Sequence, residues 1–409
     1  MKPFRILFPT DRFSPHDRAV ALVMWTVGVV QGFAQAQPAS TLPFIRVALG
    51  LTEGEISALL AIARLLSLGA IVIAMVGDRR GRRLPLLGSY VLLVVATGAT
   101  ALIAGPLGFA TTQGLVRIGT SAISALGVVW LAEQLSPAVR AYGVSLYGAA
   151  GSLGAGAAIL ALPLAERDWR LPYLLTLAGL ALVPWLSKRV RESPLIDSEP
   201  RVGRGARWAV GEAVGAVATE AGAIRFWIAG AAGLLASAFS AVGLAFSTER
   251  LVSSVGLTTA SAVAVTLIGG TLGGVGFFIG GRMSDSWGRK PTTVLSLLMI
   301  LSGGVALYQV EELPLLIAAI AVSSFGSFAY IPSAATHRAE MFPTRSRASV
   351  TSSLGWLGTL GSATGLAIGR FTIDGMGLSN TMNLLGVGVL IAAGLTLLLP
   401  ETKGRILTA

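Results

Sequence analysis

The sequence has no cysteine among its 409 residues, so disulfides, thiolate metal sites and cysteine nucleophiles are excluded. Charge is also scarce, because only 12% of the residues are charged and every acidic residue falls in a loop or at the end of an apolar stretch. The HExxH, GxSxG and P-loop patterns are missing, which argues against a membrane enzyme and against ATP-driven transport by this chain alone. The sequence therefore predicts no catalytic site, no metal site and no cofactor.

Apolar residues are abundant instead: 53% of the chain is hydrophobic, 51 residues are glycine and the mean hydropathy is +0.74. A helix needs roughly 20 mostly apolar residues to cross a bilayer, and stretches of this length recur. We predict an all-α membrane protein surrounded by lipid. The twelve predicted spans lie near residues 19–40, 55–76, 84–104, 107–131, 142–165, 170–187, 223–247, 257–281, 291–309, 313–335, 349–370 and 380–400. The alternative for the first span is a cleaved secretory signal, since an Ala-Gln-Ala site follows its apolar run.

The distribution of positive charge predicts the orientation. The net charge is +11, but the basic residues form no continuous face with interleaved aromatics, so no nucleic-acid partner is expected. With a cytoplasmic N-terminus, most of the 31 Lys and Arg residues lie in inside segments. The outside positions hold only Arg46, Arg167, Arg170, Arg250 and Arg370. The positive-inside rule therefore predicts an inner-membrane protein with both termini in the cytoplasm.

The longest polar connection divides the chain into halves. We predict an N-terminal six-helix bundle over residues 1–187, a cytoplasmic central loop over 188–222 and a C-terminal six-helix bundle over 223–409. Residues 208–223 are mildly apolar and form either a short helix at the membrane surface or a loosely ordered loop. A monomer is sufficient for this architecture.

One register relates the two halves. Residues in the loops after spans 2 and 4 recur 207 residues later, in the loops after spans 8 and 10. The pairs are Asp78 and Asp285, Gly81 and Gly288, Arg82 and Arg289, Arg83 and Lys290, Glu133 and Glu340, and Arg140 and Arg347. The same offset pairs glycines of spans 5 and 11, where glycine at every third residue lets another backbone approach closely. Duplicated six-helix halves are typical of a transporter whose halves rock about a midplane site.

These loops resemble the signature of the major facilitator superfamily, G-x-x-x-D-R-x-G-R-R/K, in both halves. The first copy has Asp78, Arg79, Gly81, Arg82 and Arg83, and the second has Gly281, Asp285, Gly288, Arg289 and Lys290. The departures are Ala74 in place of the first glycine and Ser286 in place of the second arginine. The loops after spans 4 and 10 resemble the family's E-x-x-P-x-x-x-R pattern. Glu340, Pro343 and Arg347 meet it fully, whereas the copy with Glu133 and Arg140 has its proline shifted to Pro137. The resemblance covers essentially the whole chain.

In that family the loop is a conformational latch, and the resemblance implies this role for Asp78, Arg82, Asp285 and Arg289. Physically, an aspartate, a turn glycine and arginines at a helix end can form ion pairs and helix-end contacts that hold the halves together on the inside. The alternative is that these charges only anchor the topology.

Two arginines lie within predicted spans. Arg64 and Arg117 are both roughly 14 Å below the outer face at 1.5 Å per residue. A buried cation is normally offset by a partner or a ligand, and an anionic or carboxylate-bearing substrate is one such partner. The alternative is that each arginine bonds helix carbonyls or glutamines and braces the bundle.

Other polar groups in spans are candidates for a substrate site. Gln31 and Gln35 share a helix face in span 1 and either bind a polar solute or bond across helices. Pro38 and Pro43 predict a kink at the outer end of this span. In the second half the candidates are Tyr330 and Trp356, with Ser237 and Ser240 as weaker ones; single aromatics also serve packing.

The favoured function is a secondary transporter that moves a small organic solute, an anionic metabolite among the options, by alternating access, with proton symport left open. The other function is multidrug efflux by drug:proton antiport. Against efflux, span 5 lacks the Gly-Pro of such exporters, and Thr120 and Ser121 replace the Gln-Gly that should follow Arg117 in span 4.

Overall fold

The computed structural model describes residues 13–136, 139–192, 220–342 and 347–403. In these ranges every regular element is a helix, and eleven helical stretches are long and apolar enough to cross a membrane. The last of them, Ser353–Leu398, contains Gly377 with φ of 80°, which breaks it into two rods. The described residues therefore provide the twelve crossings that the sequence predicts.

The helices group into two compact units. The first comprises Met1–Ile45 and Leu66–Val202, and the second comprises Arg46–Leu65 and Gly203–Ala409. The second unit thus includes the first half of predicted span 2, up to Leu65. The sequence analysis assigns this span to the N-terminal bundle. The predicted bundle boundaries stay a prediction, and residues 193–219 of the predicted central loop lie outside the described residues.

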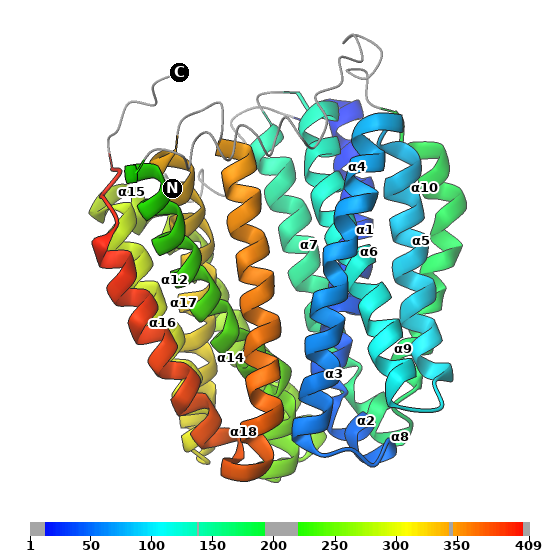
Figure 1. Cartoon of the computed structure of the whole chain (residues 1–409). Coiled ribbons are helices and arrows are strands. Elements are labelled where there is room, and N and C mark those ends of the chain that lie inside the picture. The colour runs from blue at the N-terminus through cyan, green and yellow to red at the C-terminus, as the bar shows by residue number, and fades with distance from the viewer. Residues whose placement is uncertain (1–12, 137–138, 193–219, 343–346, 404–409) are drawn as a thin grey trace, which may run out of the picture. The chain divides into compact units, whose positions relative to one another are not determined.

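The first unit contains four long helices and several shorter ones (Figure 1). These are α1 (Pro15–Ser40), α4 (Ala70–Arg80), α5 (Arg83–Ala99), α6 (Pro106–Gln134), α7 (Arg140–Leu160), α8 (Leu162–Arg167), α9 (Leu171–Thr176) and α10 (Val183–Arg189). Short 3₁₀ segments continue several of them, so that α9 and α10 form one crossing, Leu171–Arg189. α2 (Leu42–Ala48) spans the boundary between the units.

The second unit contains most of α3 (Glu53–Leu66) and the helices of the second sequence half. These are α12 (Glu220–Ala245), α13 (Ser247–Glu249), α14 (Thr259–Gly274), α15 (Gly276–Trp287), α16 (Arg289–Gln309), α17 (Leu313–Met341) and α18 (Arg347–Leu398), with a π-helical turn at Arg250–Ser254. Figure 1 shows α18 as separate orange and red rods. α12 packs along α18, and α17 packs against α14, α15 and α16.

Glycines let two helix pairs approach closely, as the repeat predicts. A Cβ on Gly154 of α7 would lie 2.0 Å from the Val29 carbonyl oxygen of α1. At the matching position, a Cβ on Gly361 of α18 would lie 2.2 Å from the Leu234 carbonyl oxygen of α12. Lipid provides little hydrophobic drive for helix association, so such close backbone packing is a principal source of stability.

Sequence signals also define the ends of α1. Ser14 and Asp17 form a capping box, in which the Asp17 backbone N–H donates to the Ser14 hydroxyl at 3.1 Å. At the other end, α1 stops at Thr41 and α2 begins at once, so the helix breaks between Pro38 and Pro43. The predicted interruption of the first span is confirmed.

Candidate functional site

The turn between α4 and α5 is built on Gly81, whose φ is 104°. Only glycine adopts this backbone readily, and a Cβ here would also lie 2.5 Å from Glu192 Oε2. The next residue, Arg82, forms an ion pair with Glu133 at the end of α6. The Glu192 carboxylate accepts a hydrogen bond from the Arg82 backbone N–H at 2.7 Å. The turn and its partners therefore link one end of four spans of the first unit, those that contain α4, α5, α6 and α10.

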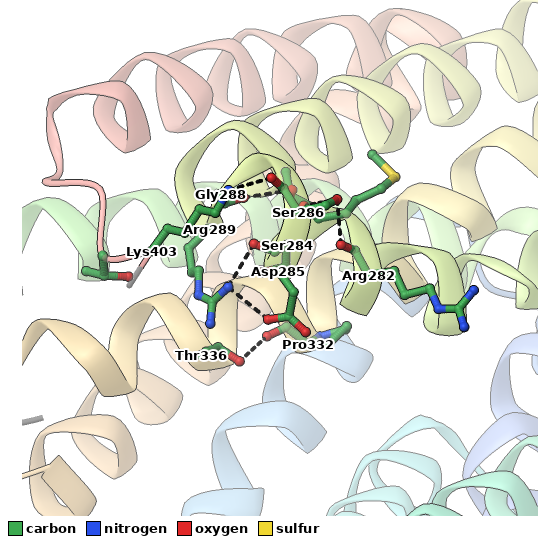
Figure 2. A network of polar contacts seen from close by, with 12 residues as sticks. Arg282, Ser284, Asp285, Ser286, Gly288, Arg289, Pro332, Thr336 and Lys403 are labelled. Atoms are coloured by element: carbon green, nitrogen blue, oxygen red, sulfur yellow. Dashed lines mark hydrogen bonds and ion pairs between the residues drawn. The ribbon is translucent and has the colours of Figure 1, made fainter. Parts of the chain in front are cut away.

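The turn between α15 and α16 repeats this arrangement in the second unit. Gly288 has φ of 123°, and Arg289 contacts Glu340 at the end of α17 with an Nε–O distance of 3.1 Å. Arg289 also donates to Asp285 at 2.8 Å and to the Ser284 carbonyl at 2.8 Å, as Figure 2 shows. The Arg82–Glu133 pair thus lies within the first unit and the Arg289–Glu340 pair within the second.

In the second unit Glu401 binds the glycine turn as Glu192 does in the first. Its carboxylate accepts from the Arg289 backbone N–H at 2.9 Å and from that of Lys290 at 3.0 Å. Burial alone would raise the pKa of Glu401, but the hydrogen bonds from Lys403, Arg289, Lys290 and Thr402 outweigh it and lower that pKa. The carboxylate is therefore ionised over the neutral range.

The sequence analysis did not identify Glu192 and Glu401 as partners of the two turns. Each follows the last span of its half and stands in a similar setting, Glu-Ser-Pro in one case and Glu-Thr-Lys in the other. That recurrence was the available signal. The spacing of 209 residues differs from the 207 of the other pairs, so a search at one fixed offset does not find it.

The remaining loop residues of the prediction are partly described. Arg83 donates to the Ser187 carbonyl at 2.9 Å, and Lys290 donates to the Leu397 carbonyl at 3.2 Å. Each therefore binds the C-terminal end of the last span of its own half. The side chains of Asp78, Arg79, Arg140 and Arg347 lie outside the described residues.

A polar network connects α1, α6 and α7 within the membrane-spanning part of the first unit. The amide nitrogen of Gln31 donates to the Thr120 carbonyl at 3.1 Å and to the Ser124 hydroxyl at 2.8 Å. Its amide oxygen accepts from the Tyr147 hydroxyl at 2.5 Å. Gln31 thus bonds across helices, as one of its two predicted roles requires, and the sequence missed Tyr147, Thr120 and Ser124 as its partners.

Arg117 lies on the same side of α6 as this network. Positions 117, 121 and 124 share one helix face, where Ser121 and Ser124 are exposed and Arg117 is half-buried. Gln35, one turn after Gln31 on α1, is also exposed. Polar side chains exposed along spanning helices are typical of a water-filled cavity, because facing them to lipid is costly. We name these groups the polar face of the first unit: Gln31, Gln35, Arg117, Ser121, Ser124 and Tyr147.

A sequence model of the Major Facilitator Superfamily matches residues 24–308 and 228–407. The chain belongs to the Major Facilitator Superfamily. Members of this superfamily are transporters, so the protein is a multi-pass membrane transporter of the secondary type, acts on a small-molecule substrate and is not an enzyme.

Solved facilitator structures share the fold at low identity. A bacterial homologue of the human lysosomal transporter Spinster, inward-facing and occupied, has a TM-score of 0.76 at 17% identity, over 95% of this chain and 97% of that one. A D-xylose–proton symporter has a TM-score of 0.75 at 19% identity, over 96% and 100% of the two chains. The nucleoside transporter NupG has a TM-score of 0.72 at 13% identity, over 93% and 98%. No curated protein sequence matches the chain.

The other predicted site residues of this facilitator belong to the second unit. Arg64 is half-buried in α3, and Trp356 is 45% exposed on α18. Tyr330, half-buried on α17, accepts a hydrogen bond from Arg338 at 2.6 Å. Among the described residues Trp356 forms no ring contact or hydrogen bond with Tyr330. The sequence prediction missed Arg338, although it stands two turns after Tyr330 on the same helix.

A second charged cluster of the facilitator includes Arg46 and Glu249, which lie outside the spanning segments, and Asp374, which lies close to the break in α18. Arg46 donates to Glu249 at 2.7 Å, and the Glu249 side chain is fully buried. Burial alone would lower the pKa of Arg46, but the hydrogen bonds and the charge of Glu249 raise it, so this residue remains cationic. Asp374 of α18 accepts from the Gly54 backbone N–H at 2.9 Å and from the Thr52 hydroxyl at 2.7 Å, and so caps the start of α3.

Proposed function

We propose that this facilitator moves a small organic anion across the inner membrane by alternating access. The polar face of the first unit carries the proposal. It combines the positive charge of Arg117 with hydroxyl and amide groups, and an arginine fork matches a carboxylate or phosphate in geometry. Gln31, Thr120, Ser124 and Tyr147 fix the positions of the neighbouring hydroxyl and amide groups, and such preorganisation strengthens binding.

A thermal-shift screen tests the substrate class. The purified protein is heated with organic acids, sugars, amino acids or lipophilic cationic drugs, and a ligand that binds the native state raises the unfolding temperature. We expect stabilisation by organic acids in the wild type and its loss in Arg117→Gln. Arg18→Gln, which removes an exposed arginine near the start of α1, is the matched control and should respond like the wild type.

The screen also separates the competing function. Stabilisation by lipophilic cations that persists in Arg117→Gln would favour multidrug efflux and count against anion transport. An equal loss of binding for every ligand in Arg117→Gln, together with a lower unfolding temperature without ligand, would assign Arg117 a bracing role.

Protons are the first coupling ion to test, because the D-xylose–proton symporter with the same fold is named for proton symport. In proteoliposomes, uptake of the stabilising anion should rise with an inward proton gradient and fall when an uncoupler dissipates it. Uptake that is equal with and without the gradient would contradict proton coupling.

The turns after α4 and α15 are proposed as a conformational latch because an aspartate, a glycine and an arginine recur in both of them. Each described arginine–glutamate pair lies within one unit, where it holds the turn in place. Replacing Asp78 with Asn should favour an inward-open state and reduce transport without reducing expression. Asp168→Asn, at an exposed position after α8, is the control. Normal transport by Asp78→Asn, with unchanged labelling of single cysteines in the outer part of the spans, would contradict the latch.

A further inference from the structure

Arg338 lies in the last turn of α17, which ends at Met341. An arginine at the end of a spanning helix usually extends outward and places its charge in the headgroup region or in water. Arg338 does the opposite. Its guanidinium donates to the Tyr330 hydroxyl at 2.6 Å, although Tyr330 lies eight residues earlier, about 12 Å back along the helix axis.

The two side chains form one compact unit. The Arg338 guanidinium carbon is 5.7 Å from the centre of the Tyr330 ring, a distance at which the cation is attracted by the ring face. Both residues are half-buried. The pair thus holds a positive charge toward the middle of the spanning helix, where a cation is costly unless a polar environment or an anion compensates it.

The guanidinium also reaches toward a helix that α17 does not pack along. α12 packs mainly on α18, whereas α17 packs on α14, α15 and α16. Nevertheless, an Arg338 terminal nitrogen lies 3.4 Å from the position that a Cβ on Gly233 of α12 would occupy. The glycine leaves room for the guanidinium between the two helices, and within the described residues no carboxylate forms an ion pair with it.

We propose that Arg338 and Tyr330, opposite Gly233, form an oxyanion-binding site for a carboxylate-bearing solute. The guanidinium fork donates two hydrogen bonds to the carboxylate, and the Tyr330 hydroxyl orients the fork. This inference rests on the proposed function and deepens it, since it assigns an anion-binding group to the second unit as well. A phosphate group satisfies the same chemistry, and the experiment distinguishes the two.

Isothermal titration of the full-length protein in lipid nanodiscs tests the site. The probes are acetate, succinate, citrate, benzoate and inorganic phosphate. We expect a carboxylate to bind the wild type and its affinity to fall about tenfold to a hundredfold in Arg338→Gln, the range for losing a charged hydrogen bond. Arg338→Lys should recover part of the affinity, and Tyr330→Phe should lose less than Arg338→Gln.

Arg282→Gln is the matched control, because it removes an exposed arginine from the same unit, and its side chain points away from Arg289 in Figure 2. Unchanged carboxylate affinity in Arg338→Gln, with the affinity still lost in Arg117→Gln, would overturn this site and leave the proposed function standing. Tighter binding of phosphate than of any carboxylate would overturn the carboxylate assignment. If none of the anions binds the wild type, the proposed function itself fails.

Discussion

At the scale of single residues, the Arg46–Glu249 ion pair shows how much depends on one buried charge. Glu249 has no exposed side-chain surface, and Arg46 is its ion-pair partner among the described residues. A buried charge that loses its partner keeps the desolvation penalty without the compensating attraction, and Arg46, whose side chain is 22% exposed, keeps part of that penalty when Glu249 loses its charge. Glu249 is therefore critical for folding even though it is not one of the proposed binding groups.

Glu249→Gln should accordingly lower the free energy of unfolding by about 3–5 kcal/mol, the range for breaking a buried pair. Denaturation of the detergent-purified protein, followed by tryptophan fluorescence, measures it. Glu311→Gln is the control, because Glu311 is 75% exposed and lies 3.9 Å from Arg250. The control should change stability by less than about 1 kcal/mol. Equal effects of the two substitutions would contradict the assignment.

The lowered pKa of Glu401 predicts that the stability of the folded protein depends on pH. Because the native pKa is lower than the ordinary value of 4.5, its ionised form stabilises the folded state above that value. This stabilisation is lost as the pH falls below about 4.5 and through the native pKa. The difference in unfolding temperature between the wild type and Glu401→Gln should therefore be constant from about pH 7 to pH 5 and shrink below it. A difference that instead grows with acidity would contradict the sign, and Glu166→Gln, at an exposed position, should show no such window.

At the scale of helices, the internal repeat has a direct packing consequence. Gly154 and Gly361 occupy matching positions, and each lies where the facing backbone leaves no room for a side chain. Gly148 and Gly355 also match each other, yet a Cβ on either would meet nothing within 4 Å. The repeat therefore contains glycines that packing requires and glycines that it does not.

Alanine substitutions should separate the two kinds of glycine. Gly154→Ala and Gly361→Ala force the helices apart and should each destabilise the protein by about 1–3 kcal/mol, the cost of overpacking. Gly148→Ala and Gly355→Ala should be neutral or slightly stabilising, since alanine favours the helix. Melting temperatures of the four purified variants provide the measurement. Equal losses at all four positions would show that helix flexibility, not close approach, is what these glycines supply.

At the scale of the whole molecule, the absence of cysteine makes the predicted orientation simple to test, because a single introduced cysteine is the sole reactive thiol. Ser286→Cys lies in a predicted inside turn, and Glu312→Cys in a predicted outside turn; both positions are exposed. In intact cells a membrane-impermeant maleimide should label the second variant and not the first. After permeabilisation both should react, and the reverse pattern would invert the topology.

The amino-acid sequence by itself determined the twelve crossings, the repeat and the family, because lipid demands long apolar segments and a duplicated chain keeps its register. It also indicated the residues of the turns after α4 and α15, since an arginine, a glycine and a glutamate recur at fixed places. It did not indicate Tyr147 as a partner of Gln31, or Arg338 as a partner of Tyr330, because an isolated polar residue in a span has no periodicity that points to its neighbour. The contacts of Glu192 and Glu401 also depend on tertiary structure. Chain segments far apart in sequence meet only when the helices pack, and that packing decides which polar groups satisfy one another and which remain available for a ligand.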